Sequence, residues 1–166
     1  MKLELKNQLS IICNLNGLLQ LLISEALEIL QKETCLRFNY TLNFTNAVLR
    51  YVNGSNRCYS YLGKFSNDDR YNVVVGRDCS YIMGVLHETL HTIGVIHEMA
   101  RHDRDSYIDV KCENIKSASQ HNFDRYDLGE ASPFDLKCDF GSVMYYNRYQ
   151  QITKKQWYQK LSIKVI

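Results

Sequence analysis

Several features that would place this chain in a common class are scarce or absent. It has one proline and eight glycines among 166 residues, and it shows no internal repeat or low-complexity tract. Lys and Arg number 20 against 18 Asp and Glu, so the formal charge of +2 lacks the basic excess that nucleic-acid binding usually requires. No apolar run reaches the roughly 18 residues needed to cross a bilayer. We therefore expect a single domain, 1–166, with no nucleic-acid partner and no transmembrane segment.

Six cysteines are present, but no two have the close spacing of a zinc finger or a redox motif. They are Cys13, Cys35, Cys58, Cys79, Cys112 and Cys138. Three N-glycosylation sequons begin at Asn39, Asn43 and Asn53. Together these features predict disulfide bonds, glycosylation and an oxidising compartment, so we expect a secreted or extracellular protein.

The amino-terminal segment, 1–23, has an atypical pattern. Its lysines and the apolar run 18–23 suggest a secretory signal peptide, but Glu4 and several polar residues interrupt the pattern, and no cleavage site is clear. An amphipathic helix packed on the core is the interpretation that we favour.

Hydrophobic periodicity over the next part, 24–97, predicts helices and strands in one layered unit. Ile23, Leu27 and Leu30 form one apolar face of a helix that should end near Thr34. Four further strands are predicted at 36–40, 47–52, 58–63 and 71–76. A second helix is predicted at 81–93. After a short strand at 107–110 the sequence is irregular, so we expect a less regular second part over 98–166.

The second predicted helix contains the pattern H-E-x-x-H-x-x-G-x-x-H from His87 to His97. His87 and His91 are four residues apart, so their imidazoles lie one helical turn apart on the same face. Gly94 allows the chain to leave the helix sharply, so that His97 can reach the same point. Three imidazoles leave an open position on zinc, as in catalytic sites, and Glu88 is close enough to act on a water there.

This extended motif resembles the signature of the metzincin metallopeptidases, with Ser142-Val143-Met144-Tyr145-Tyr146 in the place of their Met-turn. Met144 would be the apolar floor beneath the histidines. Within that clan the segments 33–38, 58–63 and 97–105 resemble the astacin family of zinc metalloendopeptidases. The resemblance covers about 23–149. It implies an α+β, zincin-like fold in which a helix-backed twisted sheet and an active-site helix precede an irregular subdomain.

The resemblance also implies the roles of the site residues. His87, His91 and His97 would hold one Zn²⁺ per chain, and Glu88 would be the general base. Tyr146 matches an astacin tyrosine that can ligate zinc and then swing away to stabilise the oxyanion. The expected function is a secreted endopeptidase that hydrolyses protein or peptide substrates with a zinc-activated water.

Two further features follow from the same resemblance. Tyr59, Ser60 and Tyr61 match the edge strand on which astacins pair an extended substrate, although an ordinary sheet edge is an equal alternative. A disulfide between Cys58 and Cys79 is also implied.

A dense charge run formed by Glu98, Arg101, Asp103, Arg104 and Asp105 matches the family closely. Most such runs are solvated surface, but the match suggests a buried network below the site.

The two ends of the chain depart from the family pattern. The usual first strand before the helix at Ser24 and the closing helix after Tyr149 have no clear counterparts, and Cys35 lacks its usual late partner. Cys112 and Cys138 could pair with each other. A second hypothesis is therefore a truncated, catalytically impaired remnant that binds zinc or protein without turnover. A third, a structural zinc module, is disfavoured because no cluster of cysteine ligands is present.

Overall fold

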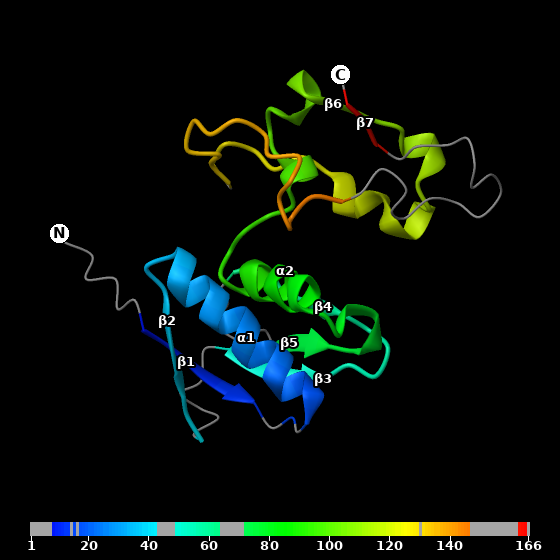
Figure 1. The fold of residues 1–166 in the computed structure, drawn as a ribbon. Helices are drawn as coiled ribbons and strands as arrows, with labels where there is room; N and C mark the ends of the chain where they lie inside the picture. The colour runs from blue at the N-terminus through cyan, green and yellow to red at the C-terminus, as the bar shows by residue number, and fades with distance from the viewer. Residues whose placement is uncertain are drawn as a thin grey trace. The chain divides into compact units, whose positions relative to one another are not determined.

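A computed structural model describes residues 8–13, 15, 17–42, 49–63, 72–129, 131–146 and 163–165. The chain divides into two compact units, Met1–Val95 and Ile96–Ile166. The first contains a five-stranded sheet and two α-helices, and the second contains short 3₁₀ helices and a two-stranded sheet (Figure 1). None of the helices in the described part of the chain is long and apolar enough to span a bilayer.

The first unit begins with a strand and a helix, continues through further strands and ends in a second α-helix. Its elements are β1 (Gln8–Cys13), α1 (Leu18–Glu33), β2 (Arg37–Tyr40), β3 (Leu49–Asn53), β4 (Tyr59–Ser60), β5 (Asn72–Val75), the 3₁₀ helix η2 (Arg77–Cys79) and α2 (Ile82–Thr92). The strand order is β2-β1-β3-β5-β4. All neighbours in this sheet are parallel except β4, which pairs antiparallel with β5 at the edge. The helix α2 and the strands β2 to β5 fall at the predicted places, although β4 is shorter than expected.

The amino-terminal segment corrects one prediction. Residues 8–13 form β1, a strand in the interior of the sheet, and α1 begins at Leu18, six residues earlier than expected. The expected absence of a first strand is therefore wrong. The apolar residues Leu9 and Ile11 alternate with polar ones, which suits a strand, and the non-local pairing of β1 with β2 and β3 then fixes this segment in the sheet.

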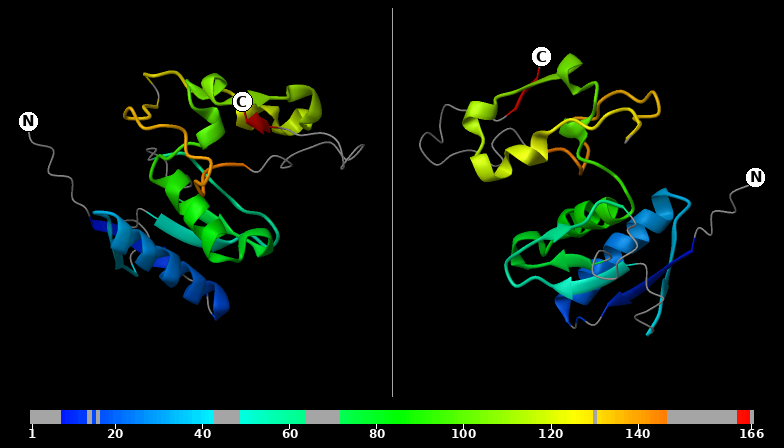
Figure 2. Two further views of the ribbon diagram at one scale, coloured as in Figure 1. Left: turned by 45° about the horizontal axis from the view of Figure 1, so that its top comes forward. Right: turned by 180° about the vertical axis from the view of Figure 1, so that it is seen from behind.

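One face of the sheet packs against both helices, which lie side by side (Figures 1 and 2). The register places Ile11 opposite Leu49, and Tyr51 opposite Val73, so these four buried side chains share a face. The Tyr51 hydroxyl lies 2.9 Å from Oγ1 of Thr89 on α2, so this face is the one that α2 covers. The sheet thereby provides a rigid support for α2.

The second unit has little regular structure. Its elements are η3 (Glu98–Ala100), η4 (Arg104–Ser106), β6 (Ile108–Val110), η5 (Cys112–Asn114), η6 (Ser117–Phe123) and β7 (Ile163–Val165). β6 confirms the predicted short strand and pairs antiparallel with β7. A small core is formed by Met99, Ile108, Ile115 and Phe123. The expectation about a closing helix falls mostly on 147–162, which lie outside the described residues.

The cysteines separate into one bonded pair and four free thiols. Cys58 and Cys79 form the disulfide that the family resemblance implies, and it joins the residue before β4 to the end of η2. Cys112 and Cys138 are not bonded to each other, which corrects the pairing considered from the sequence. Cys112 is exposed on η5, whereas Cys138 is buried in the loop that follows Leu136 and Lys137, so the two thiols lie in different environments.

Candidate metal centre

The helix α2 carries the first two histidines of the motif. Val85, Leu86 and Thr89 are buried toward the sheet, while His87 and His91 are half-buried. The imidazole rings of His87 and His91 meet edge to face with centroids 4.6 Å apart, as expected for side chains one helical turn apart.

The chain turns sharply after α2 and brings a third histidine to the first two. Gly94 has a φ of +101°, a left-handed conformation that favours glycine, and its N–H donates to the carbonyl of His91 at 2.9 Å. The ligand atoms of His87, His91 and His97, all from the short segment 87–97, lie within 4.8 Å of one another. In the described part of the chain, no other group of three or more His, Cys, Asp and Glu residues could hold a metal ion.

The ring nitrogens of these three histidines are suitable ligands for zinc. A carbonyl can only accept, so Nδ1 of His91, 2.9 Å from the carbonyl oxygen of Val95, carries the proton, and Nε2 keeps its lone pair for a metal. Burial, followed by the neighbouring charge of His87, lowers the pKa of His91 to about 4. The imidazole is therefore neutral at physiological pH, which is the form that binds a metal.

Glu88 lies beside the first histidine and is 8% exposed. Burial raises the pKa of its carboxyl to about 7, and a hydrogen bond from Ser60 acts in the opposite direction. The Ser60 hydroxyl oxygen lies 3.0 Å from Oε2 of Glu88 and 2.7 Å from the carbonyl oxygen of the same residue. A desolvated carboxyl of this kind is suited to general acid–base chemistry.

The edge strand β4 contains Tyr59 and Ser60, two of the three predicted substrate-binding residues, and Tyr61 follows it directly. Tyr59 and Tyr61 are 48% and 49% exposed, whereas Ser60 faces α2 and contacts Glu88. The contact of Ser60 with Glu88 was not predicted from the sequence. The two residues are 28 positions apart, and only the strand register brings them together.

The second unit contains the predicted Met-turn and tyrosine. Met144 is buried, and its carbonyl accepts a hydrogen bond from the backbone N–H of Glu98 at 3.0 Å. The Tyr146 ring lies 4.4 Å from the ring of His97 and 5.6 Å from that of Phe123, between centroids. Tyr146 is therefore a close neighbour of the last histidine of the motif.

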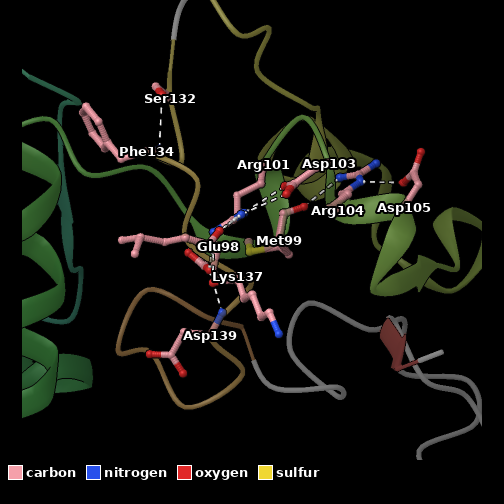
Figure 3. A network of polar contacts seen from close by, with 11 residues as sticks. Glu98, Met99, Arg101, Asp103, Arg104, Asp105, Ser132, Phe134, Lys137 and Asp139 are labelled. Atoms are coloured by element: carbon pink, nitrogen blue, oxygen red, sulfur yellow. Dashed lines mark hydrogen bonds and ion pairs between the residues drawn. The ribbon is translucent and has the colours of Figure 1, made fainter.

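The charge run forms a network around Arg101, which is 6% exposed (Figure 3). Its guanidinium donates to the carboxylates of Glu98 and Asp103 at 3.1 Å and 2.9 Å. It also donates to the carbonyl of Leu136 at 2.6 Å and contacts that of Lys137 at 3.4 Å.

The charge run thus contains both a buried centre and an exposed end. The buried network suggested by the sequence is confirmed at Arg101, whereas the carboxylate of Asp105 is 59% exposed. Nothing in the sequence indicated that the loop containing Leu136 would supply carbonyl acceptors to Arg101.

The comparisons with known proteins agree with this arrangement. The family model described as Astacin, a peptidase family, matches residues 8–163. The chain is 38% identical over 134 residues to Blastula protease 10 of Paracentrotus lividus, covering 77% of this chain and 22% of that protein. It is 34% identical over 131 residues to Astacin-like metalloprotease toxin 1 of Loxosceles intermedia, covering 77% of this chain and 47% of that one.

A solved structure shows the same fold. High choriolytic enzyme 1, a hatching enzyme zinc-protease from Oryzias latipes, has a TM-score of 0.81 and 28% sequence identity, covering 96% of this chain and 76% of that chain. The zincin-like α+β fold predicted from the sequence is therefore confirmed. The chain spans about a fifth of the length of Blastula protease 10 and about half that of the spider toxin.

Proposed function

The chain belongs to the astacin family of zinc metalloproteases, and we propose that it is an endopeptidase that hydrolyses peptide bonds in proteins. The observation that carries this proposal is the convergence of three histidine ligand atoms within 4.8 Å, beside a buried carboxyl on the same helix. A closed structural zinc site would require a fourth protein ligand, and three imidazole ligands leave one position open.

We propose that His87, His91 and His97 hold one zinc ion. Zinc bound there would polarise the scissile carbonyl and lower the pKa of a water. The hydrogen bond from Nδ1 of His91 to the carbonyl of Val95 orients the ring so that Nε2 is the nitrogen that would ligate the metal.

The proposed role of Glu88 is to take a proton from the attacking water and to return it to the leaving amine. Its burial keeps bulk water from competing for the carboxyl, and its raised pKa brings it close to the operating pH, where a general base is most effective. The proposed role of Tyr146 is to donate its phenolic hydrogen to the oxyanion that develops on the substrate carbonyl.

An extended peptide is the proposed form of the substrate. β4 lies at the edge of the sheet, where backbone groups on its outer side can pair with an added strand. Tyr59 on this strand and Tyr61 just after it are both about half exposed and would flank such a peptide.

We also propose that the protein works outside the cell or in the secretory pathway. Support comes from the disulfide between Cys58 and Cys79, which persists in oxidising compartments. Two of the sequon asparagines, Asn39 and Asn53, are exposed and thus accessible to glycosylation.

The test is cleavage of casein, an unstructured protein, by the purified chain loaded with zinc. We expect cleavage that a zinc chelator abolishes and that added zinc restores. Glu88→Ala should bind zinc but lose at least about 100-fold in rate, since a general base contributes about that much. A folded, zinc-loaded chain without activity would favour the non-catalytic remnant. Full activity in Glu88→Ala would overturn the mechanism.

A further inference from the structure

We propose that Ser60 is a positioning residue that holds the Glu88 carboxylate in the orientation needed for proton transfer. This inference rests on the function proposed above and adds a residue to it. Ser60 lies on β4, the strand on which substrate pairing is proposed, so one strand would contact both the substrate and the general base.

The sheet register directs the Ser60 side chain toward α2. Ser60 pairs with Val73 on β5, and Val73 pairs with Tyr51 on β3, so the three side chains lie in one row across the same face. Tyr51 in this row contacts Thr89 of α2 through its hydroxyl, and Ser60 contacts Glu88, the preceding residue of the helix. A shift of one residue in β4 would turn Ser60 to the opposite face of the sheet.

The Ser60 hydroxyl contacts two acceptors of one residue. Its oxygen lies 2.7 Å from the carbonyl oxygen of Glu88 and 3.0 Å from Oε2. The two distances together restrict the side-chain torsions of Glu88, because the carboxyl and its own backbone carbonyl must both stay near the same hydroxyl. The hydroxyl has one hydrogen to share between these two oxygens, and the burial of Glu88 limits the water that could replace it.

The position of Ser60 is itself fixed on both sides. Two residues earlier, Cys58 is bonded to Cys79, which lies just before α2. Three residues later, the N–H of Gly63 donates to the carbonyl of His91 at 2.9 Å. The segment 58–63 is thus bonded near both ends of the active-site helix. Ser60 is therefore held in place and can restrain the side chain of Glu88.

The test compares Ser60→Ala, Ser60→Thr and Thr92→Val. Thr92 is the matched control because its hydroxyl donates to the same Glu88 carbonyl, at 3.1 Å, so Thr92→Val removes that bond without touching the carboxyl. We expect kcat to fall about 10-fold or more in Ser60→Ala, with KM changed by less than about twofold, since the lost bond is to a charged group. Ser60→Thr should recover most of kcat because it keeps the hydroxyl.

Thr92→Val should keep kcat within about twofold of the unaltered chain, because it leaves the carboxyl contact in place. Zinc content, measured on every variant, should not change. Loss of kcat in Thr92→Val as large as in Ser60→Ala would overturn the proposal, and so would unchanged kcat in Ser60→Ala.

A second readout does not depend on activity. Crystal structures of the unaltered chain and of Ser60→Ala should show one Glu88 side-chain conformer in the first and several in the second. The same single conformer in both would overturn the positioning role. If the unaltered chain fails to cleave casein, the proposed endopeptidase function fails, and these two structures still decide whether Ser60 orders Glu88.

Discussion

Each of the two units of the chain is stabilised internally by a different kind of interaction. In the first unit, a mixed sheet and two helices bury a continuous apolar face, to which Ile11, Leu49 and Val73 contribute. In the described part of the second unit, short 3₁₀ helices connect loops, and the guanidinium groups of Arg101 and Arg104 donate to backbone carbonyls of distant residues, Leu136 and Phe123. A unit of the first kind should tolerate the loss of one polar contact, whereas a unit of the second kind depends on a few charged side chains.

The largest loss of stability should follow removal of the Arg101 guanidinium in Arg101→Met. Glu98, Asp103 and two backbone carbonyls would lose their donor, so the free energy of unfolding of the second unit should fall by about 3 to 5 kcal/mol. Urea unfolding, with limited proteolysis to localise the change, measures the effect.

Arg125→Met is the control for that variant. Arg125 pairs with Asp105 at 2.7 Å, but both side chains are more than half exposed, so less than about 0.5 kcal/mol should be lost. Equal losses in the two variants would contradict the view that burial of Arg101 is what organises the second unit.

The first unit should depend on its disulfide. Replacing both Cys58 and Cys79 with Ala frees a loop closed over a separation of 21 residues, which should lower the free energy of unfolding by about 3 kcal/mol. Thermal unfolding measures the loss, and Cys35→Ala, at an exposed free thiol, is the control that should change little. A stability unchanged by the double replacement would show that the sheet alone holds β4 in place.

A smaller, pH-dependent effect is expected at Asp103. The hydrogen bond from Arg101 lowers the pKa of the Asp103 carboxyl. The carboxylate therefore stabilises the fold above its unfolded pKa, near 4, and this contribution is lost as the pH falls through the lower folded pKa.

Comparison of the unaltered chain with Asp103→Asn measures this contribution. The difference in unfolding free energy should be about 1 to 2 kcal/mol at neutral pH and should shrink toward zero as the pH falls through the lowered pKa of the Asp103 carboxyl. A difference that stays constant over this range would show that the charge of Asp103 is not what matters.

The smallest effect should come from a polar contact inside the first unit. Tyr51→Phe removes the hydroxyl that lies 2.9 Å from Oγ1 of Thr89, and Thr89 still donates to the carbonyl of Val85. We expect a loss of about 1 kcal/mol. Tyr40→Phe removes an exposed contact with Ser24 and should change stability by less than about 0.5 kcal/mol. A larger loss in Tyr40→Phe would reverse the expected order.

The sequence predicted best what is local. The histidines, Glu88 and Gly94 lie within eleven consecutive residues, so helical geometry and one glycine turn decide which side chains meet. The helix α2 and four of the strands were likewise predicted at the right places, because their apolar patterns repeat within a few residues.

Contacts between segments that are distant in the chain could not be predicted from the sequence. β1 falls in the segment for which an amphipathic helix was favoured, because its role as a strand depends on pairing with β2 and β3, more than 20 residues away. The Ser60 hydroxyl meets Glu88 only because β4 pairs with β5 in one register. The Arg101 guanidinium reaches the carbonyl of Leu136 across 35 residues of irregular chain, for which no periodic pattern exists.

The central claim is that the three histidines bind zinc and that Glu88 transfers protons in the reaction but is not a metal ligand. The most direct test is zinc affinity by competition with a chelator, in the unaltered chain, His91→Ala and Glu88→Ala. We predict that His91→Ala loses at least about 100-fold in affinity, while Glu88→Ala stays within about 10-fold of the unaltered chain. Unchanged zinc affinity in His91→Ala would contradict the proposed metal centre.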